Sequence, residues 1–268
     1  VILDKEDHAS IYDACRLSYG KLLRYEHNDM EALERCLQRV PESAGALIVT
    51  DGLFSMSGDI ANLPEIVRLA KTYGARVMVD DAHGLGTLGK GGRGTPSHFG
   101  LEQEVDVYMG TFSKSLASLG GYMAGKSRIV DYVRHNSRPF IFSASVPPAS
   151  CAAALAALNV LEEEPELPER LLRLSDFFRE ALKQRGMSIR ESRTPIVPIF
   201  TYTADRTLRI AMELYKQGLF VNTVLPPAAP ADGCMLRTSL MATLTESLLE
   251  EAADILSRVL SMPEYAMK

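Results

Sequence analysis

The stretch that decides the fold is a short apolar run followed by polar residues, Ala75-Arg-Val-Met-Val-Asp80 and then Asp81-Ala-His83. The run comes directly after residues 62–74, whose apolar positions recur at helical spacing. Asn62-Leu-Pro-Glu65 predicts the start of that helix, with Asn as cap, Pro in the first turn and Glu three residues after the cap. Further apolar runs, each predicting a strand, lie at 1–4, 46–50 and 105–109. Buried strands linked by helices predict a mostly parallel sheet in an α/β domain.

The character of the chain changes after Ser145-Val-Pro-Pro148. An alanine-rich helix is predicted over 148–163 and a second helix over 167–185. The segments beyond them predict strands at 196–202, 219–221 and 235–240, a helix between the first two strands, and a last helix over 246–260 with its cap signal at Thr243-Leu-Thr-Glu246. We therefore expect a larger domain over 1–147 and a smaller C-terminal α+β domain over 148–268. Because Val1 stands inside a predicted strand, we also expect the larger domain to lack its N-terminal part.

Composition excludes several classes of protein. The net charge is -5 with pI about 5.6, so there is no basic face for a nucleic-acid partner. No run of about 18 apolar residues predicts a membrane helix. The four cysteines form no CxxC pair, which predicts free thiols in a reducing compartment and no metal site. These features favour a cytoplasmic enzyme.

A glycine pattern at 84–89 imitates the dinucleotide-binding fingerprint. Gly84-Leu-Gly86-Thr-Leu-Gly89 has the GxGxxG spacing after a strand. The third glycine of that fingerprint must open a helix, yet here Lys90-Gly-Gly-Arg-Gly94 and Pro96 follow, where no helix can begin. We therefore expect no NAD site.

Polar residues follow three of the predicted strands, in segments 51–57, 80–83 and 111–114. Each segment has a simpler explanation alone, because an Asp after a strand often caps a turn and a Lys in a Gly/Ser loop is often solvated. In an open α/β sheet, however, ligands bind at the carboxyl ends of the strands. Together the segments supply a carboxylate, an imidazole, hydroxyls and an amine at one edge of the sheet, which is the set that pyridoxal phosphate requires. We expect Lys114 to form the Schiff base, Asp80 to pair with the ring nitrogen, His83 and Ser55 to contact the ring oxygen, and Thr111 to bind phosphate.

Two motifs carry a family resemblance. Val79-Asp-Asp-Ala-His-Gly84 and Gly110-Thr-Phe-Ser-Lys-Ser-Leu-Ala-Ser-Leu-Gly-Gly121 together resemble the α-oxoamine synthases. The likeness extends along the chain through Asp7-His-Ala-Ser10, Asp51-Gly-Leu-Phe-Ser-Met-Ser-Gly-Asp59, Gly92-Arg-Gly94, Phe142-Ser-Ala-Ser145 and Leu236-Arg-Thr-Ser239. It implies a fold type I pyridoxal-phosphate-dependent transferase, with a cofactor-binding large domain and a smaller C-terminal domain.

The resemblance adds roles that the residue pattern alone does not. His8 would stack on the pyridine ring, and Arg237 would bind the carboxylate of the amino-acid substrate. Ser143 would reach the phosphate of the neighbouring subunit, because the family's sites lie at the interface of a homodimer. Without the family, His8 would be a residue at a helix start and Arg237 a surface arginine at a strand edge. The implied reaction joins an amino acid to an acyl-CoA and releases CoA and usually CO2.

Within the family, Thr111-Phe-Ser-Lys-Ser-Leu-Ala-Ser118 and Leu240-Met-Ala-Thr-Leu-Thr245 look most like bacterial serine palmitoyltransferases. Glycine C-acetyltransferase and 8-amino-7-oxononanoate synthase remain alternatives. From other classes we consider a non-catalytic subunit of such an enzyme, which would be expected to lose the lysine, an inactive fragment of such an enzyme, and an ordinary aminotransferase. The family's glycine turn for the phosphate lies in a preceding segment that this sequence does not include.

Overall fold

A computed structural model describes residues 1–265, which form two compact units. Residues 1–54 and 60–165 make the first unit, and residues 55–59 join the chain from 166 onward in the second. The helix α7 (Pro148–Glu163) therefore belongs by its contacts to the first unit, whereas the predicted smaller domain begins at 148. The domain limits 1–147 and 148–268 stay a prediction, since clusters of contacts and domains are different divisions of a chain.

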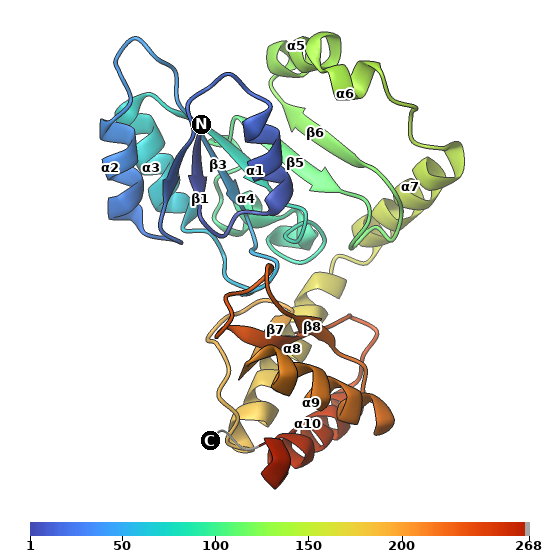
Figure 1. The fold of residues 1–268 in the computed structure, drawn as a ribbon. Coiled ribbons are helices and arrows are strands. Elements are labelled where there is room, and N and C mark those ends of the chain that lie inside the picture. The colour runs from blue at the N-terminus through green and yellow to red at the C-terminus, as the bar shows by residue number, and fades with distance from the viewer. Residues whose placement is uncertain (266–268) are drawn as a thin grey trace. The chain divides into compact units, whose positions relative to one another are not determined.

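The first unit is built on a six-stranded sheet (Figure 1). The strands, in chain order, are β1 (Ile2–Asp4), β2 (Leu23–Tyr25), β3 (Leu47–Asp51), β4 (Arg76–Asp80), β5 (Val107–Thr111) and β6 (Gly121–Gly125). Their order across the sheet is β2-β1-β3-β4-β5-β6, and every neighbouring pair is parallel except β5 and β6. The predicted α/β class with a mostly parallel sheet is thus confirmed.

Helices lie between these strands or follow β6, and α2 and α3 contribute much of the core. They are α1 (Ala9–Arg16), α2 (Met30–Gln38), α3 (Leu63–Tyr73), α4 (Thr95–His98), α5 (Ser127–Asn136), α6 (Arg138–Ile141), α7 and the 3-10 turn η1 (Lys90–Gly92). The prediction that no helix can begin over 90–96 is wrong, because η1 lies there and α4 begins at Thr95 with Pro96 in its first turn, where proline is tolerated. Leu33 of α2 and Ile66 of α3 are buried in one cluster with Ile48 and Val77 of the sheet. Burying each such side chain stabilises the fold by about 1.5–3 kcal/mol. This core holds β1, β3 and β4 in place, and with them the strand ends that carry polar residues.

The start of α3 differs in one detail from the prediction. Asn62 occupies the cap position, but its side chain makes no cap hydrogen bond. Its backbone N–H donates instead to Asn28 Oδ1 at 3.0 Å, so the helix start is held by a contact distant in sequence. The predicted end of the helix at Gly74 is confirmed, and this glycine has φ of 66°, in the left-handed region.

The second unit contains a three-stranded antiparallel sheet with the order β7-β9-β8. Its elements are α8 (Leu167–Gln184), β7 (Ile196–Tyr202), α9 (Ala204–Lys216), β8 (Asn222–Val224), β9 (Cys234–Ser239), α10 (Glu246–Leu260) and the 3-10 turn η2 (Pro263–Tyr265). The strand predicted at 219–221 begins three residues later, because Leu219 N still donates to Leu214 O and completes the end of α9. Thr245, not Thr243, caps α10 and accepts a hydrogen bond from Leu248 N.

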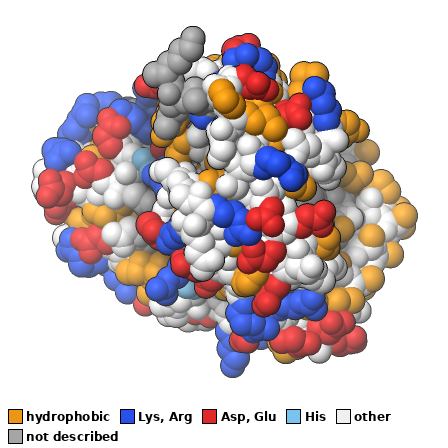
Figure 2. Space-filling model, turned by 90° about the horizontal axis from the view of Figure 1, so that it is seen from below, with side chains coloured by type: hydrophobic (Ala, Val, Ile, Leu, Met, Phe, Trp, Pro, Cys, Tyr) orange, Lys and Arg blue, Asp and Glu red, His pale blue; other side chains and the backbone are white. Residues whose placement is uncertain are grey.

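The surface mixes both signs of charge. Figure 2 shows Lys and Arg side chains interspersed with Asp and Glu on the face drawn there. Among residues 1–265 no helix is both long and apolar enough to cross a membrane.

Candidate active site

The candidate site lies at the carboxyl ends of the parallel strands of the first unit. β3 ends at Asp51, β4 at Asp80 and β5 at Thr111. Asp51 and Asp80 stand opposite each other in the register of β3 and β4. The parallel register therefore brings polar residues from separate parts of the chain to one edge of the sheet, as the sequence pattern predicts.

Asp80 is buried at this edge, and two basic groups act on it. Its Oδ1 accepts a hydrogen bond from Ala82 N at 3.1 Å. Burial raises the pKa of Asp80, while the Ala82 hydrogen bond and the charges of Lys114 and His8 lower it. A lysine and a histidine thus act electrostatically on one buried carboxyl group, although they come from different loops.

The neighbouring carboxyl, Asp81, has a structural role. Its Oδ2 accepts a hydrogen bond from Thr95 N at 2.8 Å, and its Oδ1 accepts one from Thr95 Oγ1 at 2.7 Å. A Cβ placed on Gly84 or Gly94 would lie 2.0 or 1.7 Å from an Asp81 carboxyl oxygen. Burial raises the pKa of Asp81 to about 6. Because Asp81 closes the 81–95 loop in this way, Asp80 is the better candidate to contact a ligand.

The loop between β5 and β6 carries Lys114 on its exposed surface. Thr111 Oγ1 lies 2.9 Å from Ser113 Oγ and donates to Gly120 O at 3.1 Å, which closes the loop on itself. Ser115 Oγ donates to Leu85 O at 2.7 Å and ties the loop to the turn after β4. Lys114 is therefore held between two anchored residues, and the Thr111 and Ser113 hydroxyls lie close to it in the chain.

Two histidines lie on turns at the same edge. His8 precedes α1, and its Nδ1 is 2.8 Å from Ser10 Oγ. Its backbone N donates to Asp51 Oδ2 at 3.1 Å. His83 is half-buried in the turn after β4, where its carbonyl oxygen accepts a hydrogen bond from Thr87 Oγ1 at 2.7 Å.

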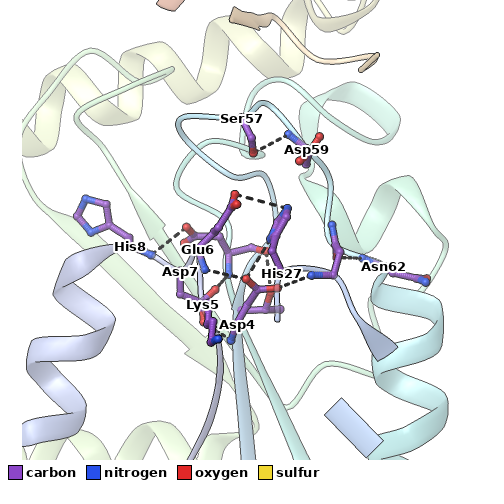
Figure 3. A network of polar contacts seen from close by, with 12 residues as sticks. Asp4, Lys5, Glu6, Asp7, His8, His27, Ser57, Asp59 and Asn62 are labelled. Atoms are coloured by element: carbon purple, nitrogen blue, oxygen red, sulfur yellow. Dashed lines mark hydrogen bonds and ion pairs between the residues drawn. The ribbon is translucent and has the colours of Figure 1, made fainter. Parts of the chain in front are cut away.

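Asp4, Asp7 and Asp51 are buried carboxyl groups that the sequence pattern does not single out, and Figure 3 shows Asp4 and Asp7 among the polar residues near His8 and His27. Asp7 Oδ1 accepts a hydrogen bond from Asp51 N at 2.8 Å, and Asp7 Oδ2 accepts one from Asp4 N at 3.0 Å. Asp4 also contacts His27 Nδ1 at 3.0 Å. Burial is the main cause that raises the pKa of Asp7 to about 9 and of Asp51 to about 8. The motifs at 7–10 and 51–59 contain both residues, but nothing local indicates that they meet.

The other predicted residues come from other parts of the chain. Ser55 and Arg237 belong to the second unit, where Arg237 Nε donates to Ser55 O at 2.5 Å and a guanidinium NH group donates to Ser239 Oγ at 2.5 Å. Arg237 also lines a cavity of about 520 Å³ within that unit, whose other walls are mainly apolar residues of 217–222, 238–241 and α10. Ser143 is exposed in the first unit, between α6 and α7.

Comparison with known proteins defines the class. The chain matches the family "Aminotransferase class I and II" over residues 1–256, and it belongs to that family. Its relatives show that, within this larger family, the chain belongs to the α-oxoamine synthases. It is 47% identical over 264 residues to serine palmitoyltransferase of Sphingobacterium spiritivorum and 47% identical over 261 residues to 8-amino-7-oxononanoate synthase of Citrifermentans bemidjiense.

A solved structure supports the same assignment. It is a serine palmitoyltransferase variant from S. paucimobilis with a bound PLP–myriocin aldimine, and it matches with a TM-score of 0.93 and 36% identity over 97% of this chain. The chain covers 66% of the length of that structure. Its match to the Sphingobacterium relative covers 98% of this chain but only 66% of that relative. For the relative from Citrifermentans the two shares are 67% and 97%.

Proposed function

We propose that the protein is a pyridoxal-phosphate-dependent acyltransferase that condenses an amino acid with an acyl-CoA and releases CoA and usually CO2. The observation that carries this proposal is the position of the buried Asp80 and of the Thr111–Lys114 segment at the carboxyl ends of the paired parallel strands β4 and β5. An amine, an imidazole and a carboxyl at the carboxyl ends of parallel strands form the donor set that pyridoxal phosphate needs, and the hydroxyl of Thr111 is on the same edge.

The bound cofactor would supply an electron-accepting ring that stabilises negative charge on the α-carbon of the amino acid. Lys114 would hold the cofactor covalently and then accept the α-proton of the amino acid. Asp80 would keep the ring nitrogen protonated, and its burial at the end of β4 suits a charge-assisted hydrogen bond. His8 would lie against the ring and exclude water from that face.

The other predicted residues would bind and orient the cofactor and the substrate. His83 and Ser55 would contact the ring oxygen, and Thr111 would donate to the phosphate. Arg237 would pair with the substrate carboxylate through two parallel hydrogen bonds, a geometry that its planar guanidinium favours. These roles rest on the family motifs at the matching positions.

For substrates we propose serine and a long-chain acyl-CoA. Four relatives at 43–47% identity carry the name serine palmitoyltransferase. The alternative of an 8-amino-7-oxononanoate synthase is supported by a relative at 47% identity, and a glycine C-acetyltransferase remains the third candidate. The presence of Lys114 argues against a non-catalytic subunit.

We also propose a homodimer with shared sites, in the cytoplasm. Ser143 is exposed beside Phe140, Ile141 and Phe142, which are 64%, 48% and 82% exposed. None of the residues of α5 is buried, and α7 buries only Ala154. Large apolar side chains exposed together in one segment favour an interaction site, and a two-fold interface would place Ser143 at the partner's phosphate.

Product analysis of the whole protein tests the reaction. We expect CoA thiol to appear when serine and a long-chain acyl-CoA are supplied together, and no keto acid to form from serine alone. Lys114→Ala should abolish both thiol release and the visible absorbance of bound cofactor, whereas Lys126→Ala, at another exposed lysine of the same unit, should leave both unchanged. Keto-acid formation without thiol release would show an aminotransferase instead.

A further inference from the structure

Asp7 and Asp51 are two buried carboxyl residues that have no part in the chemistry proposed above. Asp7 lies in the turn after β1 and is 6% exposed, and Asp51 ends β3 and is 5% exposed. Asp7 accepts a hydrogen bond from the backbone of Asp51, while Asp51 accepts one from the backbone of His8, the residue after Asp7. The two hydrogen bonds run in opposite directions between the turn after β1 and the end of β3. We call this pair of hydrogen bonds the 7–51 clamp.

The clamp fixes the backbone of His8, and Ser10 fixes its ring. Ser10 N donates to His8 Nδ1 at 3.3 Å, and Ser10 Oγ lies 2.8 Å from the same nitrogen. Asp51 also stands opposite Asp80 in the register of the sheet, so the clamp joins the turn carrying His8 to the strand beside Asp80. Both a backbone anchor and a ring anchor are therefore present for one exposed imidazole.

We propose that Asp51 is a positioning residue whose side-chain oxygen holds the backbone of His8 at the sheet edge, so that the His8 ring meets the cofactor bound at Asp80. This inference rests on the proposed function for the identity of the cofactor. It assigns Asp51 an action through His8 and not on the reacting atoms.

The protonation state of Asp51 indicates what the clamp requires. Burial raises the pKa of Asp51 to about 8, and the charge of Asp80 adds to this effect. The His8 N–H and the charge of Lys114 lower the pKa, and Asp4 raises it again. At pH 7 the neutral carboxyl still offers a carbonyl oxygen as acceptor. The side-chain amide of Asn offers the same acceptor, so the clamp should tolerate Asn and fail with Ala.

The test compares Asp51→Asn with Asp51→Ala in the whole protein. The first measurement is the NMR signal of the His8 imidazole in cofactor-free protein with labelled histidine, assigned through His8→Ala. The second is the dissociation constant of pyridoxal phosphate, from its absorbance. We expect Asp51→Ala to move the His8 signal and to weaken cofactor binding about tenfold, equivalent to about 1.4 kcal/mol. We expect Asp51→Asn to keep both near the parent values.

The matched control is Asp29→Ala in the same unit. Asp29 also accepts a backbone hydrogen bond at a helix start, from Ala32 N at 2.9 Å, but at α2. It should leave the His8 signal and the dissociation constant unchanged.

Each other outcome decides against the inference. An unchanged His8 signal and an unchanged dissociation constant in Asp51→Ala would overturn it. If Asp51→Asn and Asp51→Ala shift the His8 signal and weaken cofactor binding equally, the side-chain acceptor at position 51 does not position His8, which also overturns the inference. If Asp51→Ala does not fold, Asp51→Leu, which has a branched side chain of similar shape but no acceptor oxygen, takes its place with the same expected result. If the parent binds no pyridoxal phosphate, the proposed function fails, while the His8 signal still decides whether the clamp positions the ring.

Discussion

Thr95→Val should destabilise the protein because it removes the hydroxyl that donates to the buried Asp81 Oδ1. Thr95 is fully buried, and its hydroxyl donates to Asp81 Oδ1 at 2.7 Å, a short distance for a charge-assisted hydrogen bond. Val has nearly the same shape, so the substitution creates almost no cavity, and the Thr95 N–H to Asp81 Oδ2 hydrogen bond can remain. The cost is then that of one hydrogen bond to a charged group plus the desolvated oxygen, about 1.5–3 kcal/mol.

Urea unfolding at pH 8 measures this cost, because Asp81 is ionised above its pKa of about 6. The matched control is Thr72→Val on α3, whose exposed hydroxyl donates to Arg68 O at 3.0 Å. We expect the control to stay within about 0.5 kcal/mol of the parent, as surface substitutions do. A Thr95→Val protein as stable as the control would show that Asp81 does not depend on that hydroxyl, and the structural role assigned to Asp81 would be wrong.

Four further predictions concern residues of the candidate site and the turn held by Asp81. Gly84→Ala should destabilise the protein more than Gly45→Ala in thermal unfolding, because a Cβ at 84 would lie 2.0 Å from Asp81 Oδ1 whereas none at 45 meets an atom within 4 Å; equal melting temperatures would contradict this. Asp51→Asn should flatten the pH dependence of stability between about pH 4 and pH 8. Because its pKa is raised to about 8, Asp51 binds a proton in the folded state across this window, so the unfolding free energy of the parent falls as pH rises. Urea unfolding at several pH values measures this slope. Asp80→Asn should reduce kcat far more than Asp81→Asn, and the reverse order in steady-state kinetics would reject the assignment of Asp80. Arg237→Lys should raise KM for the amino acid while cofactor absorbance persists, and an unchanged KM would reject the assignment of Arg237.

Long apolar signals made much of the fold predictable from sequence. The strands β3 and β4 and the helices α7 and α10 each have a continuous apolar run or a strong helical period, and each lies close to its predicted place. The short strand β2, of three residues, has no such signal. The edge strand β6, Gly-Tyr-Met-Ala-Gly, buries none of its residues fully, so its composition does not reveal an antiparallel partner for β5.

In the candidate site, too, some residues could be placed from local sequence and others could not. The placement of Asp80, His83, Thr111 and Lys114 at one edge was predictable because each ends or follows a strand, and the carboxyl ends of parallel strands share one edge. The clamp partners Asp7 and Asp51 are 44 residues apart, and His8 and Asp51 are 43 apart. No periodicity connects positions so distant.

The residues that sequence reasoning missed are those that act through other residues. A side chain that touches a cofactor must be of one chemical type at one strand end, and that requirement leaves a pattern in the sequence. An acceptor for a backbone N–H is less demanding, because Asp, Asn or Ser can supply it, and its partner is a group that every residue except proline carries. Asp81 and Asp51 illustrate the consequence, since both hold turns through backbone N–H groups of Thr95 and His8. Their roles depend on which amide the folded chain brings to them, and only the three-dimensional arrangement of β1, β3 and β4 decides that.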